Sequence, residues 1–413
     1  MAIKVIALFL LSFSIVVSFV LIIWVLFNPP EIKSIEYRYH SNREIESIVQ
    51  RFASEHPEIA RSHLIGQTKR NNSIWALEIS DNPGEHEPGE AEIKLIANIH
   101  GNEAIGRELL LHLIDLLIGS YRTDPQIKWL VDNLRIHIVP TMNPDGFDRA
   151  IEGDCMGIEG RENANQIDLN RNFPDQFYPR LDEIQPETSM IMNWSRTHPF
   201  VLSLSLHGGA LVANYPFDNN QENRKNYSKS PDDDVFRYLA HLYSKNHPQM
   251  SKGRCEDVCD LDLIEEYFPD GITNGAEWYP VNGGMQDWNY IECDCFELTI
   301  ETGCRKFPHS NTIRNYWKEH RNSLLKFMMA TYTGINGFVF DQNHQPLSNA
   351  IISIEGIDKN ITTKRDGDYW RLLTPNRTYT IEVRKDGFKK EKIENFLLEN
   401  SHQINFTLIR DSL

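Results

Sequence analysis

The sequence is short of basic residues. It has 42 Lys and Arg residues against 58 Asp and Glu residues, which gives a formal net charge of -16. The acidic excess lies in residues 1–333, because residues 334–413 carry 11 basic and 11 acidic residues. Phosphate binding needs basic patches, so this balance argues against nucleic acid as a partner. It mildly favours a cationic ligand, although solubility alone explains a negative surface equally well.

Two common hydrolase motifs are absent as well. The chain contains no H-E-x-x-H zinc helix and no G-x-S-x-G nucleophile elbow. The composition is otherwise globular, with 40% hydrophobic and 24% charged residues in a chain of 413. This length leaves room for a main domain of about 300 residues and a smaller module.

One stretch near the N-terminus has no charged residue. Residues 5–27 are uncharged, and such a run can cross a hydrocarbon core of about 30 Å. The run ends without the small residues of a signal-peptide cleavage site. We therefore expect a signal anchor in residues 1–30, in preference to a cleaved signal peptide. Either alternative sends the rest of the chain into the secretory lumen or outside the cell, with membrane contact through residues 5–27 if they are retained.

Cysteine is scarce. The six residues are Cys155, Cys255, Cys259, Cys293, Cys295 and Cys304, an even number that is compatible with disulfides. The sequence does not choose among the pairings, and a second metal site built from Cys255, Cys259, Cys293 and Cys295 is the less favoured alternative. Six N-x-S/T acceptors also suit a luminal protein: Asn71, Asn193, Asn226, Asn360, Asn376 and Asn405. Residues 405–413 lack a long apolar tail, so we expect no C-terminal lipid anchor.

Potential metal ligands follow two apolar runs. Residues 93–99 are typical of a buried strand, and His100 and Glu103 come directly after them, before a helical apolar pattern. Residues 201–206 are a second buried-strand run, which ends at His207. Imidazole and carboxylate groups are good zinc ligands, and catalytic zinc usually takes three protein ligands. A solvated turn is the plainer interpretation of the first pair alone, and the second strand end argues against it.

Further motifs agree in order and spacing with one family. They are H-G-N-E from His100, N-P-D-G-F from Asn143, D-L-N-R-N-F-P-D from Asp168, L-H-G-G from Leu206, N-Y-P-F-D from Asn214, G-I-T-N-G from Gly271, G-G-M-Q-D from Gly283 and F-E-L-T-I-E from Phe296. From about residue 35 to its end, the chain resembles the zinc metallocarboxypeptidases, and within them the N/E or regulatory branch that includes carboxypeptidases D, E, M and N.

The resemblance implies a zinc site and a general base. His100, Glu103 and His207 would bind one Zn²⁺ per chain, and Glu301 would transfer protons to and from the reacting groups. Glu297 is the competing base, because residues 297 and 301 share one face of a strand.

The resemblance also implies a substrate site. Arg161 would stabilise the oxyanion, Asn170 and Arg171 would hold the C-terminal carboxylate, and Tyr279 would close on the substrate. Asp218 would select C-terminal Lys or Arg, and Gln286 would line the same pocket. The plainer interpretations are surface ion pairs for the arginines, a core position for Tyr279 and an exposed loop for Asp218.

The alternation of strands and helices predicts the fold. Strands are expected at 75–79, 93–99, 135–139, 201–206 and 296–301, and helices at 41–56, 187–197, 233–247 and 311–330. These predict an α/β domain with a mixed, mostly parallel sheet covered by helices on both faces. Short alternating segments after residue 333 predict a small all-β sandwich, similar to a transthyretin-like domain. The expected boundaries are 31–333 for the catalytic domain and 334–413 for the β domain.

The function implied by the resemblance is a metallocarboxypeptidase that releases C-terminal Lys or Arg from peptides or proteins of the secretory pathway or cell surface. One alternative is a catalytically inactive binding or scaffold member of the family. The presence of all the expected zinc ligands and catalytic residues argues against it. A carboxypeptidase acting on acidic or apolar C-termini is another, and Asp218 argues against it.

Overall fold

The computed structural model describes residues 34–179, 182–256, 259 and 266–411. The expected signal anchor falls outside these residues. Within them, no helix has the length and apolar character that a membrane span requires. The chain divides into two units, Met1–Glu36 and Tyr37–Leu413. All helices and strands of the described residues belong to the second unit.

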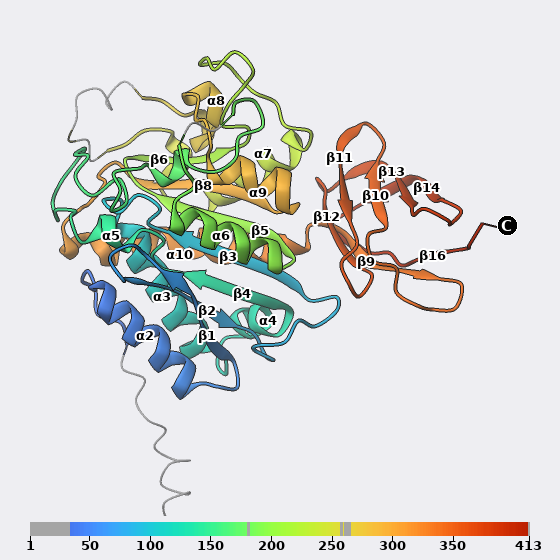
Figure 1. Cartoon of the computed structure of the whole chain (residues 1–413), viewed down its shortest axis with the longest axis horizontal. Helices are drawn as coiled ribbons and strands as arrows, with labels where there is room; N and C mark the ends of the chain where they lie inside the picture. The colour runs from blue at the N-terminus through green and yellow to red at the C-terminus, as the bar shows by residue number, and fades with distance from the viewer. Residues whose placement is uncertain (1–33, 180–181, 257–258, 260–265, 412–413) are drawn as a thin grey trace, which may run out of the picture. The chain divides into compact units, whose positions relative to one another are not determined.

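The larger part of the second unit is built on one eight-stranded sheet (Figure 1). In spatial order the strands are β1 (Ala60–Gln67), β2 (Ser73–Ile79), β4 (Leu134–Val139), β3 (Ala91–Ala97), β5 (Phe200–His207), β8 (Phe296–Gly303), β6 (Ala210–Tyr215) and β7 (Ile272–Asn274). Strands β4, β3, β5 and β8 run parallel, while β1, β2 and β6 pair antiparallel with their neighbours towards the centre. The four central strands are buried along their whole length, as parallel strands covered on both faces are.

The helices of this part are α2 (Asn42–Glu55), α3 (Ile105–Ser120), α4 (Pro125–Asn133), α5 (Pro144–Phe147), α6 (Pro186–Thr197), α7 (Asp233–Asn246), α8 (Gly275–Trp278), α9 (Met285–Cys293) and α10 (Ile313–Met329). Ser41 caps the N-terminus of α2, at the start of the helix predicted over residues 41–56. The Ser41 hydroxyl accepts from the backbone N–H of Glu44, and the Glu44 carboxylate accepts from the N–H of Ser41. Strands β1, β6 and β7 and helices α4, α5, α8 and α9 were not predicted.

Helices cover both faces of the sheet. On one face, Gly106 of α3 lies so close to the sheet that a Cβ on it would be 3.1 Å from the Cβ of Ala97. On the other face, Ile96 packs in an apolar cluster with residues of α6 and α9, among them Trp288. Successive strand side chains point to opposite faces, so neighbours in β3 contact different helix layers. The predicted mixed sheet with two helical layers is therefore confirmed.

The turn after β3 differs from the prediction. The strand ends at Ala97, two residues early, because Asn98 adopts a positive φ of 63°. The Asn98 side-chain amide donates to the carbonyls of His100 and Gly101, at 2.8 and 2.9 Å. Helix α3 begins only at residue 105, so Glu103 lies in the turn and not in the first helical turn.

The C-terminal part of the chain is an all-β domain, as predicted. One sheet has the order β11 (Ile357–Thr362), β10 (Ile351–Ile354), β13 (Arg377–Arg384), β14 (Glu391–Leu398), and the other joins β12 (Asp368–Leu372), β9 (Gly334–Asp341), β15 (Ser401–Gln403) and β16 (Phe406–Leu408). The two sheets share one apolar core that includes Val339, Ile352 and Val383. Strands β11, β14 and β15 were not predicted, and the domain boundaries at residues 30 and 333 stay predictions.

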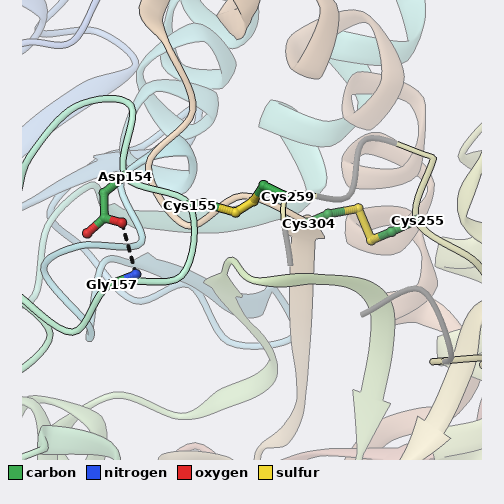
Figure 2. The surroundings of a disulfide bond; sticks show 6 residues. All are labelled: Asp154, Cys155, Gly157, Cys255, Cys259 and Cys304. Carbon is green, nitrogen blue, oxygen red and sulfur yellow. Dashed lines mark hydrogen bonds between the residues drawn. A yellow bond between two sulfur atoms is a disulfide. The ribbon is translucent and has the colours of Figure 1, made fainter. Parts of the chain in front are cut away.

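Two disulfides join loops beside β8 (Figure 2). Cys155 pairs with Cys259, and Cys255 pairs with Cys304, directly after β8. Cys293 and Cys295 are free thiols, so four of the six cysteines form disulfides. The alternative of a cysteine metal site is wrong, because two of its ligands are disulfide-bonded.

A buried ion pair joins the β domain to the larger sheet domain. One guanidinium nitrogen of Arg371 in β12 lies 2.7 Å from Oδ1 of Asp232, and neither side chain is exposed. The other carboxylate oxygen of Asp232 accepts from the Tyr290 hydroxyl at 2.8 Å. Removing one member of a buried pair leaves the other charge uncompensated, at a cost of about 3–5 kcal/mol.

We therefore predict that Asp232→Ala lowers the free energy of unfolding by about 3–5 kcal/mol, because Arg371 keeps its charge without a partner. The control is Asp234→Ala, which removes an exposed ion pair with Arg377 and is expected to cost about 1 kcal/mol or less. Denaturant unfolding of both variants measures the difference. Equal losses would contradict the prediction.

Candidate active site

The site residues expected from the sequence converge at the carboxyl ends of β3, β5 and β8. A cavity of about 250 Å³ opens there, and nine of the ten line it: His100, Glu103, Arg161, Asn170, Arg171, His207, Asp218, Tyr279 and Glu301. Parallel strands end at the same edge of a sheet, which is why residues distant in sequence meet there. Gln286 does not line the cavity.

One carboxylate oxygen links the three expected metal ligands. Oε2 of Glu103 lies 3.0 Å from Nδ1 of His100 and 3.0 Å from Nδ1 of His207. All three side chains are buried, and their ligand atoms lie within 4.8 Å of one another. The backbone N–H of Gly208 donates to the same oxygen at 3.3 Å. Burial alone would raise the pKa of Glu103, but the two histidines hold it well below its usual value.

The far nitrogens of both histidines have fixed partners. Nε2 of His100 lies 3.0 Å from Oδ1 of Asp168, and Nε2 of His207 lies 3.1 Å from the Ser205 hydroxyl. Such partners orient imidazole ligands and leave the other ring nitrogen for a metal. Two imidazoles and one carboxylate are a donor set that catalytic zinc uses. The residues therefore fit a zinc ion, held by Nδ1 of each histidine and by Glu103.

Two buried residues hold the turn that carries His100 and Glu103. The guanidinium of Arg107 donates to Oδ1 of Asn98 at 3.3 Å, to the Thr141 hydroxyl at 2.8 Å and to the carbonyl of His40 at 2.8 Å. Complete burial lowers the pKa of Arg107 to about 10. Sequence reasoning missed Asn98 and Arg107, because a polar residue in a strand-to-helix turn carries no signal of what it will contact.

Glu301 stands beside the expected metal ligands. In the parallel pairing of β5 with β8 it lies opposite His207. The side chain is buried, and its Oε2 has no hydrogen-bond partner among the described residues. Burial, followed by the negative charge of Glu103, raises the pKa of Glu301 to about 7. A carboxylate with a free oxygen and a pKa near neutrality is suited to accept and return a proton.

Glu297, the competing base, has other partners. Its Oε2 accepts from the Ser203 hydroxyl at 2.5 Å and from the side-chain amide of Asn289 at 2.7 Å. It does not line the cavity. The geometry therefore favours Glu301.

The two expected arginines have different surroundings. Arg161 is held between two carboxylates: its NH1 lies 3.1 Å from Glu103, and its Nε donates to Asp168 at 3.0 Å. Arg171 forms no ion pair with any described residue, and its NH1 donates to the carbonyl of Asn170 at 2.9 Å. The guanidinium of Arg171 is therefore the cation in the cavity that remains for an anionic group of a ligand.

Asp218 forms a buried acidic end to the cavity. It is 3% exposed, and its Oδ1 accepts from the side-chain amides of Asn214 at 3.1 Å and Gln286 at 3.0 Å. Burial raises the pKa of Asp218 to about 6. A Cβ on Gly275 would lie 1.9 Å from the same oxygen, so only glycine fits beside it. The exposed-loop interpretation of Asp218 is therefore wrong.

Gln286 contacts Asp218 without lining the cavity. It is 1% exposed, and its Oε1 accepts from the backbone N–H of Thr299 at 2.7 Å while its amide donates to Asp218. Both ends of the side chain are occupied within the protein. The expectation that Gln286 lines the pocket is corrected to a positioning role.

Tyr279 lies at the rim of the cavity and is 41% exposed, so it is not a core tyrosine. Its ring packs edge-on against Trp278, with ring centroids 4.7 Å apart. Asn214 and Lys306, to which sequence reasoning gave no role, also line the cavity. Lys306 Nζ lies 3.9 Å from Oε1 of Glu103.

Comparison with known proteins agrees with this geometry. Residues 45–323 match the family model described as zinc carboxypeptidase, and residues 334–409 match a carboxypeptidase regulatory-like domain. The chain is 48% identical over 380 residues to carboxypeptidase D of Mus musculus, which covers 91% of this chain and 27% of that protein. It is 44% identical to carboxypeptidase M of Mus musculus, over 88% of this chain and 82% of that protein.

Solved structures share the fold. The crystal structure of thrombin activatable fibrinolysis inhibitor matches with a TM-score of 0.55 and 17% identity, covering 71% of this chain and 74% of that one. Carboxypeptidase A from Helicoverpa armigera matches with a TM-score of 0.54 and 17% identity, covering 74% and 77%. The chain spans about a quarter of the length of the carboxypeptidase D relatives that it matches.

The contact between His100 and Asp168 leads to a prediction. Asp168→Asn is expected to weaken zinc binding by about 10–100-fold, because a neutral amide no longer fixes and polarises the imidazole. Competition with a zinc chelator measures the affinity. Asp358→Asn, on an exposed strand of the β domain, is the control and should bind zinc like the wild type. Unchanged affinity in Asp168→Asn would contradict the assigned contact.

Proposed function

The chain belongs to the zinc carboxypeptidase family, and we propose that it is an exopeptidase that removes C-terminal Lys or Arg from peptides or proteins. The observation that carries this proposal is that one cavity contains both the guanidinium of Arg171, which forms no ion pair with a described residue, and the buried carboxylate of Asp218. The three potential zinc ligands and Glu301 line the same cavity.

Bound zinc would supply Lewis-acid polarisation of the scissile carbonyl and of the attacking water. Glu301 would take a proton from that water and pass it to the leaving amine, since its free oxygen lies buried beside the ligands. Arg161 would stabilise the negative charge that develops on the carbonyl oxygen. Its ion pairs with Glu103 and Asp168 hold it in place for this role.

Two contacts would make the enzyme an exopeptidase. The planar guanidinium of Arg171 is shaped to bind a carboxylate with two parallel hydrogen bonds. Asn170 is fixed beside it, because its Oδ1 accepts from the backbone N–H of Met285 at 2.9 Å. A substrate without a free C-terminus would leave the Arg171 charge unpaired, so internal peptide bonds would bind poorly.

The buried carboxylate of Asp218 would select the side chain. An apolar substrate would leave this group without a cationic partner, and a site built for a polar contact strongly rejects a ligand that lacks it. Asn214 and Gln286 both donate to the same oxygen and hold the carboxylate in position. Burial raises the pKa of Asp218, and a cationic side chain beside it would favour the ionised form.

We also propose that the enzyme acts in the secretory pathway or at the cell surface. Two disulfides support an oxidising compartment. A signal anchor in residues 5–27 and glycosylation at the N-x-S/T sites belong to this proposal. Purification from cells followed by N-terminal sequencing and glycosidase treatment tests it.

Matched peptides test the proposed specificity. The zinc-loaded full chain is expected to release C-terminal Arg and Lys at least about 100-fold faster than Leu, and a zinc chelator should abolish release. Asp218→Asn should lower kcat/KM for the Arg peptide by a similar factor while leaving the Leu peptide nearly unchanged, because the amide carries no charge. Mass spectrometry of the products measures each rate.

Two outcomes would contradict this proposal. A preference for Leu would remove the specificity but keep the peptidase. No release from any peptide, in a preparation with one zinc per chain, would favour an inactive binding protein.

Glu301→Gln tests the base. It is expected to lower kcat by about 100- to 10,000-fold with zinc content unchanged, because the amide cannot accept a proton. Glu297→Gln is the matched control on the same strand face and should keep kcat near the wild-type value. In the wild type, kcat/KM should fall about tenfold per pH unit below the pKa of Glu301, which is about 7 without metal and lower beside a bound cation. Equal loss in both variants would contradict the assignment.

A further inference from the structure

A second group of potential metal ligands lies at the opposite end of β3 from the candidate active site. The loop of residues 80–90 joins β2 to β3, and it brings together the carboxylates of Asp81, Glu87 and Glu90. One oxygen from each lies within 4.8 Å of the others. Nothing in the proposed peptidase reaction uses these residues.

Glu90 shows that the group is more than a cluster of surface acids. The residue is 9% exposed, and its Oε2 is buried with no hydrogen-bond partner among the described residues. Its Oε1 accepts from the Ser80 hydroxyl at 3.3 Å. A buried, unpartnered carboxylate oxygen costs free energy unless a ligand satisfies it.

No counter-charge from the described part of the chain balances the three carboxylates. No ion pair among the described residues reaches Asp81, Glu87 or Glu90, and Asp132, whose charge also raises the pKa of Asp81, is paired with Lys128 at 2.6 Å. Burial, followed by the charges of Asp81 and Glu87, raises the pKa of Glu90 to about 7. The pKa of Asp81 is raised for the same reasons, burial and then Glu87. Like charges therefore converge here, a charge arrangement that a bound cation would stabilise.

We propose that Asp81, Glu87 and Glu90 form a Ca²⁺ site. Calcium takes six to eight oxygen ligands in flexible geometry, and three carboxylates offer up to six oxygens without nitrogen or sulfur. The Ser80 hydroxyl, within hydrogen-bond distance of Glu90, offers another. Zinc prefers nitrogen and sulfur ligands, and magnesium keeps most of its waters in a stricter octahedron.

The position of the loop indicates what calcium would do. His86 lies within the loop, with Nδ1 2.7 Å from Glu92 of β3 and Nε2 3.8 Å from Asp368 of the β domain. The backbone N–H of Gly89 donates to the same Asp368 carboxylate at 3.5 Å. A cation bound to Asp81, Glu87 and Glu90 would order the loop through which β3 contacts the β domain. Its effect would therefore be on stability, not on the chemical step.

Calcium titration of the zinc-loaded full chain tests the proposal. At constant ionic strength, calorimetry should detect binding of one Ca²⁺, with a Kd of about 0.1–1 mM as in extracellular calcium modules. At 10 mM calcium the Tm should rise by about 2 °C, because the ion binds the folded state alone. Magnesium at the same concentration should give a smaller shift.

Two variants locate the site. Glu90→Gln should lose the calcium-dependent rise in Tm, and in calcium-free buffer its Tm should equal or exceed that of the wild type because a like charge is removed. The matched control is Glu85→Gln, an exposed acid in the same loop outside the group, which should respond to calcium like the wild type. Absence of calcium binding in the wild type, its persistence in Glu90→Gln, or equal loss in Glu85→Gln would each overturn the proposal.

Discussion

The whole candidate site depends on the carboxylate of Glu103. One of its oxygens meets Nδ1 of two histidines, and the other meets Arg161. These contacts form only if β3 and β5 lie side by side, run in the same direction and end at the same level, which their register achieves by pairing Ala97 with Leu206. Strand β8 extends the same edge and places Glu301 opposite His207. The order and direction of the strands are thus the physical requirement for the chemistry, and the helices on both faces keep these polar groups in a largely buried setting.

The cavity contains charges of both signs. Arg161 and Arg171 supply positive charge, and Asp218 supplies a buried negative charge held mainly by neutral amides. Neutral donors stabilise a carboxylate less than a cation does, so the pKa of Asp218 stays raised to about 6. Because neutral amides and not a cation of the protein contact this carboxylate, it can still form a stabilising ion pair with a cationic side chain of the substrate. The same reasoning applies to Arg171, which forms no ion pair with any described residue and whose NH1 donates to a backbone carbonyl.

Much of the site could be predicted because its residues follow long apolar strands and occur in separated motifs. His100, Glu103 and His207 were identified in this way, and the structure brings them together. Partners of those residues could not be predicted, since the contact between His100 and Asp168 spans 68 positions and depends on how loops fold. Gln286 was misplaced for a related reason: a motif shows that a residue is near a pocket, but not which way its side chain points. Strand β1 was missed because its partly exposed residues give no apolar run, and the disulfide pairing needed three-dimensional distances.

Two buried carboxylates, Glu301 near the carboxyl end of β8 and Glu90 just before the start of β3, show how neighbours decide what such a group does. Glu301 and Glu90 both have a pKa raised to about 7 by burial and by negative charge, and each has a buried oxygen without a hydrogen-bond partner among the described residues. Glu301 lies beside imidazoles, arginine and a substrate-sized cavity, so its raised pKa is suited to proton transfer. Glu90 lies beside two carboxylates and a hydroxyl, which form a set of hard oxygen donors. A raised pKa therefore marks unbalanced charge in both places, and the donor types around it distinguish a base from a cation ligand.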